Sequence, residues 1–441
     1  MPDSPGTRST RRRGRTARGG ATLASTLALA AGLAVALPGA AHADEGRPVI
    51  VRLEPGSDPD AQARAATARG ARVSFVYRDV FPGYAAVLPP GGLRGIEGGP
   101  GVVAVDPDTP VRLSRADPAA PPEDGLPWGL DRIDQRPRQL SGRYAPPAAD
   151  RDGLGVTAYV IDSGIEADHD DLDGRVRSGF TAVDDGRGTH DCAGHGTHVA
   201  GTIGGAAHGV ASAVSLVAVR TLDCDGSGET SGVIAGIDWA ARDHRPGTPA
   251  VANLSLAGQV NATVDAAVRG LVADGVTVTA AAGNEDADAC RSSPGREPAV
   301  LTVAATARDD TRAPFSNRGT CVDLFAPGVD VVSAWNTGAT STKELSGTSM
   351  ASPHVAGAAA LLLGAEPALP PATVAARLLA AATPGAVRGA QRGDPDRLLY
   401  VGSVTGTPAP VIVTPAPASP PAASAGAAST AGAAAAGAPD G

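Results

Sequence analysis

Between residues 156 and 304, short unbroken apolar runs alternate with longer segments of helical pattern. The runs, rich in valine and alanine, are predicted strands at 156–161, 215–220, 250–255, 276–281 and 300–304. Helices are predicted at 198–203, 231–242, 263–274 and 349–363. Wholly apolar strands are buried on both faces, and strands that alternate with helices form a parallel sheet between helical layers. This part of the chain is therefore predicted to be an α/β domain whose chemistry gathers at the carboxyl ends of the strands.

The pattern before this domain is different. Predicted strands at 48–53, 72–77, 84–88 and 102–105 and helices at 58–69 and near 93–97 follow one another in the order β-α-β-β-α-β. That order is typical of a small ferredoxin-like α+β module. A polar, proline-rich stretch at 114–125 indicates a linker or a cleavage site.

Both ends of the chain have special compositions. Residues 1–43 contain a basic start, an apolar stretch from Ala21 to Leu37 and the sequence Ala-His-Ala before Asp44. These features predict a secretory signal; a transmembrane anchor is disfavoured by Pro38 and the small residues at the end. Residues 404–441 are almost entirely proline, alanine, serine, threonine and glycine, a composition that predicts disorder.

Charge and cysteine content restrict the classes of partner. The formal net charge is −9, and residues 1–43 carry six arginines and one aspartate, so the remainder is still more acidic. An acidic surface disfavours nucleic acid as a partner and is compatible with bound divalent cations. The four cysteines of an exported chain indicate disulfides with three possible connectivities, while a four-thiolate zinc site is disfavoured because no C-x-x-C pair is present.

One serine stands where a nucleophile would be expected. In LSGTSMASPHVAG, residues 345–357, small turn-prone residues pass directly into a long apolar run, so Ser349 lies at the start of a predicted buried helix. The positive helix end favours loss of the hydroxyl proton and stabilises an oxyanion. Taken alone, Thr348 or Ser349 is more simply interpreted as an N-cap.

Two upstream motifs change that interpretation. Asp162 ends the first strand of the α/β domain in VIDSGI, and His195 follows in GHGTHVAGTIGG, between glycines that allow close approach of other groups. His195 and His198 could instead be metal ligands on one helix face, but the glutamate of the H-E-x-x-H motif is missing.

With NLSL at 253–256 and AAAGN ending at Asn284, these motifs resemble those of the subtilisin-like serine proteases, in particular the proteinase K and aqualysin group. The resemblance spans residues 127–403, and residues 48–115 similarly resemble the inhibitor-type propeptide of these enzymes. It implies a subtilisin-like three-layer fold, with a mostly parallel sheet between helices, behind a ferredoxin-like propeptide domain. The implied organisation is a signal peptide (1–43), propeptide (44–115), linker (116–126), catalytic domain (127–403) and tail (404–441).

The resemblance also implies residue roles. Ser349 would attack the peptide carbonyl, His195 would transfer the proton, Asp162 would orient His195, and Asn284 would stabilise the oxyanion with the Ser349 N–H. Substrate would pair as an extended strand with two segments: Gly226, Ser227 and Gly228, and Ser255, Leu256, Ala257 and Gly258. The resemblance also implies a P1 pocket walled by Leu256–Gly258 and Ala280–Gly283 that favours apolar or aromatic side chains. Ala257 stands where the family usually has glycine, and its methyl group could tighten the cleft and change that preference.

Disulfides and calcium are implied in the same way. The pairing would be Cys192 with Cys224 and Cys290 with Cys321. One Ca²⁺ site would use the carbonyl groups of Pro298 and Val300 with Asp323, and a second would use Asp131, Asp134 and Gln135.

The sequence thus predicts a secreted, monomeric serine endopeptidase with structural Ca²⁺, no organic cofactor, and neither nucleic acid nor membrane as a partner. It would act on proteins and peptides and would be inhibited by its own propeptide until self-cleavage between residues 106 and 125. The alternatives are a non-catalytic binding protein of the same fold and a metalloprotease that uses His195 and His198.

Overall fold

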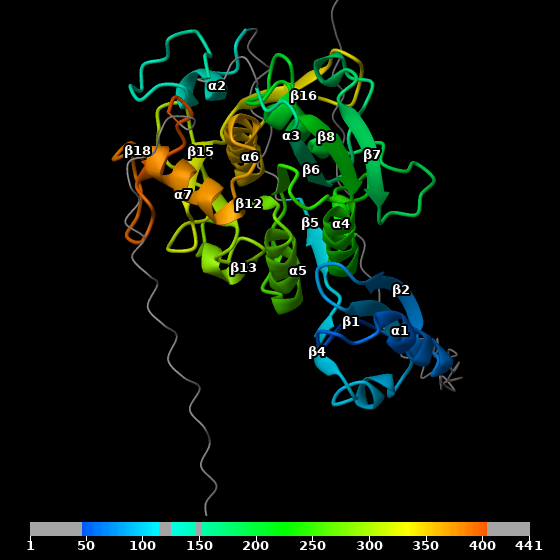
Figure 1. Cartoon of the computed structure of the whole chain (residues 1–441). Helices are drawn as coiled ribbons and strands as arrows, with labels where there is room; N and C mark the ends of the chain where they lie inside the picture. The colour runs from blue at the N-terminus through cyan, green and yellow to red at the C-terminus, as the bar shows by residue number, and fades with distance from the viewer. Residues whose placement is uncertain (1–45, 114–124, 147–151, 404–441) are drawn as a thin grey trace, which may run out of the picture. The chain divides into compact units, whose positions relative to one another are not determined.

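The computed structural model describes residues 46–113, 125–146 and 152–403, and its main element is a nine-stranded sheet (Figure 1). The strand order is β18-β19-β15-β14-β12-β10-β6-β8-β7, and all neighbours are parallel except β18 and β19. The strands are β6 (Thr157–Asp162), β7 (Val176–Thr181), β8 (Ser215–Arg220), β10 (Ala250–Leu254), β12 (Thr277–Ala281), β14 (Leu301–Thr306), β15 (Leu324–Pro327), β18 (Thr383–Pro384) and β19 (Arg397–Leu398).

Helices cover both faces of this sheet. One face carries α3 (His195–Gly204), α6 (Thr348–Ala365) and α7 (Pro371–Ala381), and the other carries α4 (Thr230–Asp243) and α5 (Ala262–Ala273). The central strand β6 shows the division, because Ala158 and Val160 pack with the first group of helices and Tyr159 and Ile161 with the second. The predicted three-layer α/β fold is confirmed.

Helix α6 lies in the middle of the protein rather than on its surface. Every residue from Thr348 to Gly364 is buried, so the helix has no polar stripe. Among the described residues, no helix is both long and apolar enough to cross a bilayer.

The N-terminal module has the predicted order. It contains β1 (Arg47–Leu53), α1 (Pro59–Ala68), β2 (Arg72–Tyr77), β3 (Gly83–Leu88), η1 (Gly92–Gly95) and β4 (Val102–Pro107). The antiparallel sheet has the order β2-β3-β1-β4, and the second predicted helix is only a short 3₁₀ turn. Val49 and Val51 pack with the module's own helix, whereas Ile50 joins the apolar cluster around α4 and α5. The outer face of this small sheet is thus packed against the larger domain.

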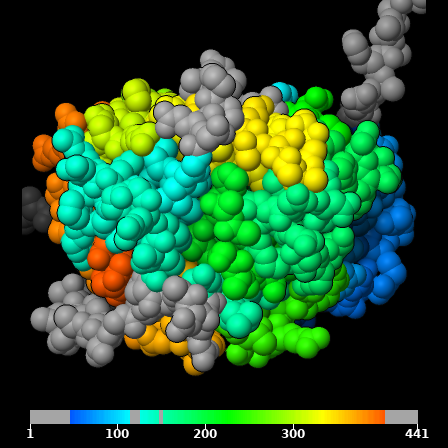
Figure 2. Space-filling view, turned by 90° about the horizontal axis from the view of Figure 1, so that it is seen from above, coloured from blue at the N-terminus to red at the C-terminus, as the bar shows by residue number. Residues whose placement is uncertain are grey.

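Short elements complete the fold. Three two-stranded pairs join β5 (Pro110–Arg112) to β9 (Ser227–Glu229), β11 (Gly258–Gln259) to β13 (Ser292–Ser293), and β16 (Val331–Ala334) to β17 (Thr342–Leu345). The remaining helical turns are α2 (Trp128–Ile133), η2 (Asp170–Leu172) and η3 (Ala289–Arg291). Seen from above, residues 125–146 (turquoise) and the β16–β17 region (yellow) share one face of the protein (Figure 2).

Some predictions concern residues outside the described ranges. These are the signal sequence at 1–43, most of the linker at 116–126 and the tail at 404–441.

Candidate active site

Asp162 and His195 form a buried hydrogen-bonded pair. Asp162 is the last residue of β6 and has no exposed surface, while His195 is the first residue of α3 and is 6% exposed. The distance between His195 Nδ1 and Asp162 Oδ1 is 2.8 Å, and the N–H of Ser163 donates to the same oxygen at 2.7 Å. This contact fixes the ring orientation and leaves His195 Nε2 as the nitrogen available for proton transfer.

Glycines on both sides of His195 make this approach possible. A Cβ at Gly196 would lie 2.1 Å from the carbonyl oxygen of Gly164, so the loop after β6 touches the backbone of α3. Gly194 precedes the helix with φ +89°, and a Cβ there would meet the Trp335 ring at 2.4 Å. The close approaches that the sequence predicted here are made, in this structure, by the protein's own backbone and by an indole ring.

A second buried carboxylate, Asp191, connects the same two elements. Its oxygens accept the hydroxyl of Ser163 at 2.9 Å, the N–H groups of Ala193, Gly194 and Thr197 at 2.8–3.0 Å, and the Thr197 hydroxyl at 2.6 Å. Burial raises the pKa of Asp191, and these donors oppose that effect by stabilising the carboxylate. Asp191 therefore holds the residue after Asp162 against the first turn of the helix that carries His195.

Ser349 lies in the first turn of α6, fully buried. Its hydroxyl group donates to the carbonyl oxygen of Ser255 at 3.0 Å. Within the described residues, His195 Nε2 has no hydrogen-bond partner. A rotation about the Cα–Cβ bond of Ser349 would direct its hydroxyl elsewhere without any movement of the helix.

Asn284 follows β12 and faces the same helix start. Its Oδ1 accepts the N–H of Thr348 at 2.9 Å and the Thr348 hydroxyl at 2.8 Å. A Cβ built at Gly347 would lie 3.2 Å from Asn284 Nδ2 and 3.6 Å from the Ser349 nitrogen. Two N–H donors therefore border one small space beside Ser349, an arrangement that suits a developing oxyanion.

The two segments predicted to bind substrate are occupied by the protein's own chain. Strand β5 pairs antiparallel with β9, with Val111 opposite Gly228 and Arg112 opposite Ser227. On its other side, Arg112 forms an antiparallel bridge with Ala257, and the N–H of Leu113 donates to the Gly226 carbonyl at 2.9 Å. The end of the N-terminal module is therefore an added strand between these segments.

A pocket of about 370 Å³ opens beside this strand, on the side of Pro110 and Arg112. The other residues that line it are Ala257, Gly258, Gln259, Glu285, Ala287, Asp288, Arg291, Ser292 and Asn317. Charged side chains border the pocket, and the Ala280–Gly283 segment, predicted as one wall of the P1 pocket, is not part of this lining.

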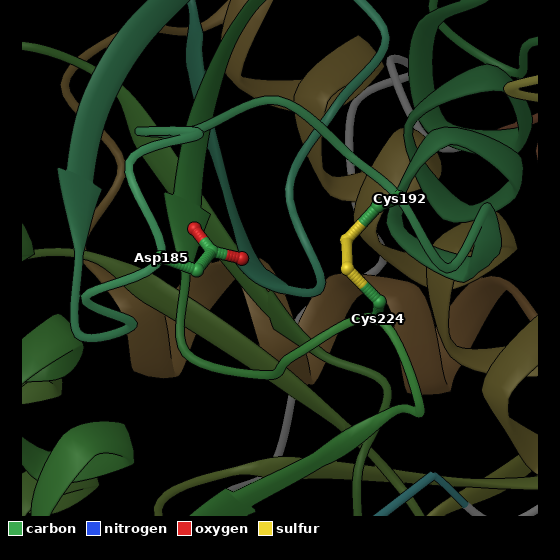
Figure 3. A group of neighbouring side chains, drawn as sticks. All are labelled: Asp185, Cys192 and Cys224. Carbon is green, nitrogen blue, oxygen red and sulfur yellow. A yellow bond between two sulfur atoms is a disulfide. The ribbon is translucent and has the colours of Figure 1, made fainter.

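The structure contains the disulfides Cys192–Cys224 and Cys290–Cys321, the pairing that the resemblance implies, and among the described residues no cysteine is free. The first disulfide joins the loop before His195 to the turn that precedes β9. Asp185 lies beside this disulfide (Figure 3). The three side chains are not a metal site, because the sulfur atoms are bonded to each other and an arginine occupies the neighbouring space.

That arginine is Arg220, whose side chain is fully buried. Its guanidinium group donates to both oxygens of Asp185 at 2.8 and 2.7 Å and contacts Cys192 Sγ at 3.3 Å. The guanidinium group lowers the pKa of Asp185 far below its usual range. Because the backbone of Arg220 pairs with Asp162 in the sheet, this cluster braces the end of the strand that lies beside the candidate site.

The residues of the first predicted calcium site offer oxygen donors at one edge of the sheet. Val300 and Asp323 come directly before the parallel neighbours β14 and β15, so they lie at the same edge of the sheet. One oxygen of Asp323 accepts the N–H of Thr302 at 2.8 Å, and burial raises the pKa of this carboxyl to about 6. A half-buried carboxylate and the carbonyl groups of Pro298 and Val300 are oxygen donors of the kind that a hard divalent cation prefers.

The second predicted site fits a cation less completely. Asp131 accepts the N–H and hydroxyl of Ser141 at 2.9 Å and the N–H of Gly142 at 2.7 Å, so its charge is already compensated. Asp134 accepts the N–H of Ala145 at 2.8 Å, and its buried Oδ1 has no partner within the described ranges. Gln135 donates to the carbonyl oxygens of Pro137 and Gln139.

The metalloprotease alternative does not fit the geometry. His198 Nε2 lies 3.0 Å from each of the carbonyl oxygens of Val331 and Lys343, and burial lowers the pKa of this residue to about 3. Its ring thus contacts the β16–β17 pair, whereas the Nδ1 of His195 contacts Asp162. The two histidines do not converge on one ion.

Sequence reasoning missed several residues around the site. The sequence motifs assign no role to Asp191 or Arg220, although both residues are fully buried. The available signal for Asp191 was its position in DCAGHGTH, four residues before His195, where an aspartate can accept N–H groups of the following helix. No pattern pointed to Arg220, because its partners come from separate loops.

Comparisons with known proteins agree with this geometry. Residues 153–399 match the model of the subtilase family, and residues 50–114 match that of the peptidase inhibitor I9. An extracellular serine proteinase of Thermus sp. (strain Rt41A) is 48% identical over 353 residues, which cover 79% of this chain and 83% of the relative. Alkaline serine exoprotease A of Vibrio alginolyticus is 46% identical over 329 residues, covering 75% and 60%. The crystal structure of a cold adapted subtilisin-like serine proteinase matches with 49% identity and a TM-score of 0.60, covering 63% of this chain and 99% of the other.

Proposed function

Because this chain belongs to the subtilase family of serine proteinases, we propose that it is a secreted endopeptidase that cleaves proteins and peptides through Ser349, His195 and Asp162. The observation that carries the proposal is the buried contact of 2.8 Å between His195 and Asp162. It is supported by Asn284, whose oxygen accepts the N–H of Thr348, the residue before Ser349. The proposed organisation is a signal peptide (1–43), propeptide (44–115), linker (116–126), catalytic domain (127–403) and tail (404–441).

In the proposed reaction, the Ser349 hydroxyl turns from the Ser255 carbonyl toward His195 Nε2. Its oxygen then bonds to the peptide carbonyl carbon while its proton passes to Nε2. The carbonyl oxygen becomes an anion that the Ser349 N–H and Asn284 Nδ2 stabilise. Collapse of this intermediate breaks the C–N bond, and the imidazolium gives its proton to the departing amine. Water then hydrolyses the acyl-enzyme by the same steps, with Asp162 stabilising the imidazolium throughout.

The pairing of β5 supports the proposed mode of substrate binding. A substrate strand would take the place of Pro110–Leu113, bonding to the segments 226–228 and 255–258 through its backbone. Backbone pairing reads side chains weakly, which supports broad specificity. We propose an apolar or aromatic P1 preference, moderated by Ala257 and by the charged residues Glu285, Asp288 and Arg291 around the neighbouring pocket.

The same strand supports self-processing. Arg112 lies opposite Ala257 in an antiparallel register, and the register advances one residue on each strand in opposite directions. In a substrate that pairs with the same register, the residue two positions after the one opposite Ala257 would lie opposite Ser255, whose carbonyl oxygen contacts the Ser349 hydroxyl. Residue 114 lies outside the described ranges. We propose cleavage between residues 114 and 115, inside the predicted interval of 106–125 and one residue before the end of the propeptide-like span 44–115.

We further propose that structural Ca²⁺ binds at Pro298, Val300 and Asp323 and, with fewer available donors, at Asp131, Asp134 and Gln135. Bound Ca²⁺ would neutralise buried carboxylates and stabilise the fold, with no part in the chemistry. The mature enzyme would act as a monomer without an organic cofactor, nucleic acid or membrane.

The test labels the mature secreted protein with a fluorophosphonate, wild type beside Ser349→Ala, followed by peptide mapping and N-terminal sequencing. We expect the label on Ser349 alone, a mature N-terminus at residue 115, and an unprocessed, unlabelled Ser349→Ala protein. A folded, propeptide-free wild type that takes no label would contradict the proposal and favour a binding protein of the same fold. Normal processing of Ser349→Ala would exclude self-cleavage.

A further inference from the structure

Behind Ser349 lies a chain of buried side-chain hydrogen bonds that the proposed reaction does not use. Asn253, near the end of β10, has no exposed surface, and its Nδ2 donates to Ser255 Oγ at 2.8 Å. The Ser255 hydroxyl in turn donates to the backbone carbonyl oxygen of Ser349 at 2.7 Å. The chain therefore ends on the backbone of the nucleophile itself.

The carbonyl group of Ser349 is available because of a proline one turn later. In an α-helix, the N–H of residue 353 would donate to the carbonyl of residue 349, but Pro353 has no N–H. A buried carbonyl group without a donor is costly. The hydroxyl of Ser255, which comes from a different element, takes the place of the missing helical donor.

Asn253 determines the donor-to-acceptor direction of these side-chain hydrogen bonds. Its Oδ1 accepts the hydroxyl of Ser352 at 2.7 Å and that of Thr279 at 3.0 Å, so the NH₂ end of the amide faces Ser255. Ser255 Oγ therefore receives a hydrogen from Asn253, and its own single hydrogen is directed to Ser349. An apolar side chain at 253 would leave the Ser255 hydroxyl without this orientation.

Ser255 also begins the segment that binds the extended strand. Ala257, two residues later, is the bridge partner of Arg112, and the Ser255 carbonyl accepts the Ser349 hydroxyl. Ser255 and Ser349 are thus joined by reciprocal hydrogen bonds of 2.7 and 3.0 Å. The position of the substrate segment relative to the nucleophile depends on this pair.

We infer that Asn253 is a positioning residue: acting through Ser255, its amide fixes the substrate-binding segment against Ser349, so that binding of an extended substrate aligns the scissile carbonyl with the nucleophile. The inference rests on the proposed proteolytic function. It concerns how binding energy from a long substrate is converted into rate, because a small misalignment of the reacting atoms reduces catalysis strongly.

The test compares secreted, matured Asn253→Ala, Ser255→Ala and the double variant on a tetrapeptide amide and on a single-residue ester. We expect each single variant to lower kcat/KM for the tetrapeptide by about 10-fold, mainly through kcat. The single-residue ester, which scarcely uses the substrate segment, should lose about 2-fold or less. The double variant should be no slower than Ser255→Ala, because Asn253 acts through Ser255.

Ser352→Ala is the matched control. It removes one hydrogen bond to the same Asn253 oxygen, keeps Thr279 as donor there, and leaves the link from Asn253 to Ser255 and Ser349 intact. We expect a lower Tm with kcat/KM for both substrates within about 2-fold of wild type. A similar loss for both substrates, additive effects in the double variant, or an equal loss in Ser352→Ala would overturn the inference.

If Asn253→Ala does not fold, Ser255→Ala still tests the inference, because this substitution deletes a single oxygen atom and is expected to leave the fold intact. A Ser255→Ala enzyme with wild-type kcat/KM for the tetrapeptide would refute the inference. Failure of the proposed function itself would look different, because wild type would then hydrolyse neither substrate.

Discussion

At the scale of single residues, Asn284 gives the sharpest prediction. Its oxygen is held by the N–H and hydroxyl of Thr348, which turns Nδ2 toward the space beside the Ser349 nitrogen. Asn284→Ala should lower kcat by on the order of 10²–10³, the range measured for loss of such a donor in a related proteinase, with little change in KM. Steady-state kinetics on a peptide amide measure both constants.

Asn284→Asp is the matched control for this residue. It keeps an acceptor oxygen for Thr348 and replaces the donor with a second, negatively charged oxygen, so we expect a fall in kcat at least as large with a smaller loss of stability. A change confined to KM in either variant would show that Asn284 binds the ground state rather than the oxyanion.

The reacting residues were predictable, whereas the residues that support them were not. Asp162, His195 and Ser349 stand in motifs in which neighbouring residue types restrict the chemistry. Asp191 and Arg220 are recognised as supporting residues by their burial and contacts, and burial of a single polar residue has no periodic signature in a sequence. Asn253 was part of a recognised motif, but its partners Thr279 and Ser352 come from other elements.

At the scale of secondary structure, the sequence predicted the strands and helices that bury continuous apolar runs, such as β8 and α6. It missed α2, α7, β7, the buried four-residue strand β15 and the β16–β17 pair, whose segments are short or mix apolar and polar residues. The pairing of β5 with β9 was also missed, because β5 has only three residues and its partner lies more than one hundred residues away. Short, distant pairings depend on the tertiary fold rather than on local preference.

The ion pair between Arg220, at the end of β8, and Asp185, in the loop before His195, predicts how the stability of the fold depends on pH. Arg220 lowers the pKa of Asp185 in the folded state, so the ionised carboxylate stabilises the fold above its unfolded pKa of about 3.9. This stabilisation is lost as pH falls toward the folded pKa. Asp185→Asn should therefore lower the Tm at pH 7, and the difference from wild type should shrink below about pH 4.

Thermal unfolding of the Ser349→Ala protein with and without Asp185→Asn measures this effect free of self-digestion. Asp309→Asn is a control, because Asp309 pairs with Arg388 at 3.0 Å with both side chains more than half exposed. Such a surface pair should change the Tm little at either pH. A difference between Asp185→Asn and its parent that persists unchanged at pH 3 would contradict the ionic origin of this stabilisation.

At the scale of the whole molecule, the N-terminal module is attached to the catalytic domain by more than β5. Asp238 of α4 is 4% exposed, and its Oδ1 accepts the N–H groups of Arg78, Asp79 and Val80 at 2.7–3.0 Å. Three N–H donors on one buried carboxylate make a strong contact.

Asp238→Ala should therefore speed release of the cleaved propeptide on the order of tenfold or more, which shortens the lag between cleavage and the appearance of activity. Peptide hydrolysis by the fully matured variant should be unchanged, since Asp238 contacts the N-terminal module rather than the substrate segments.

Arg78→Ala is the matched control, because it removes the exposed ion pair with Asp60 but keeps the N–H that Asp238 accepts. If Arg78→Ala shortens the lag as much as Asp238→Ala does, the attachment depends on surface charge instead of on this buried carboxylate.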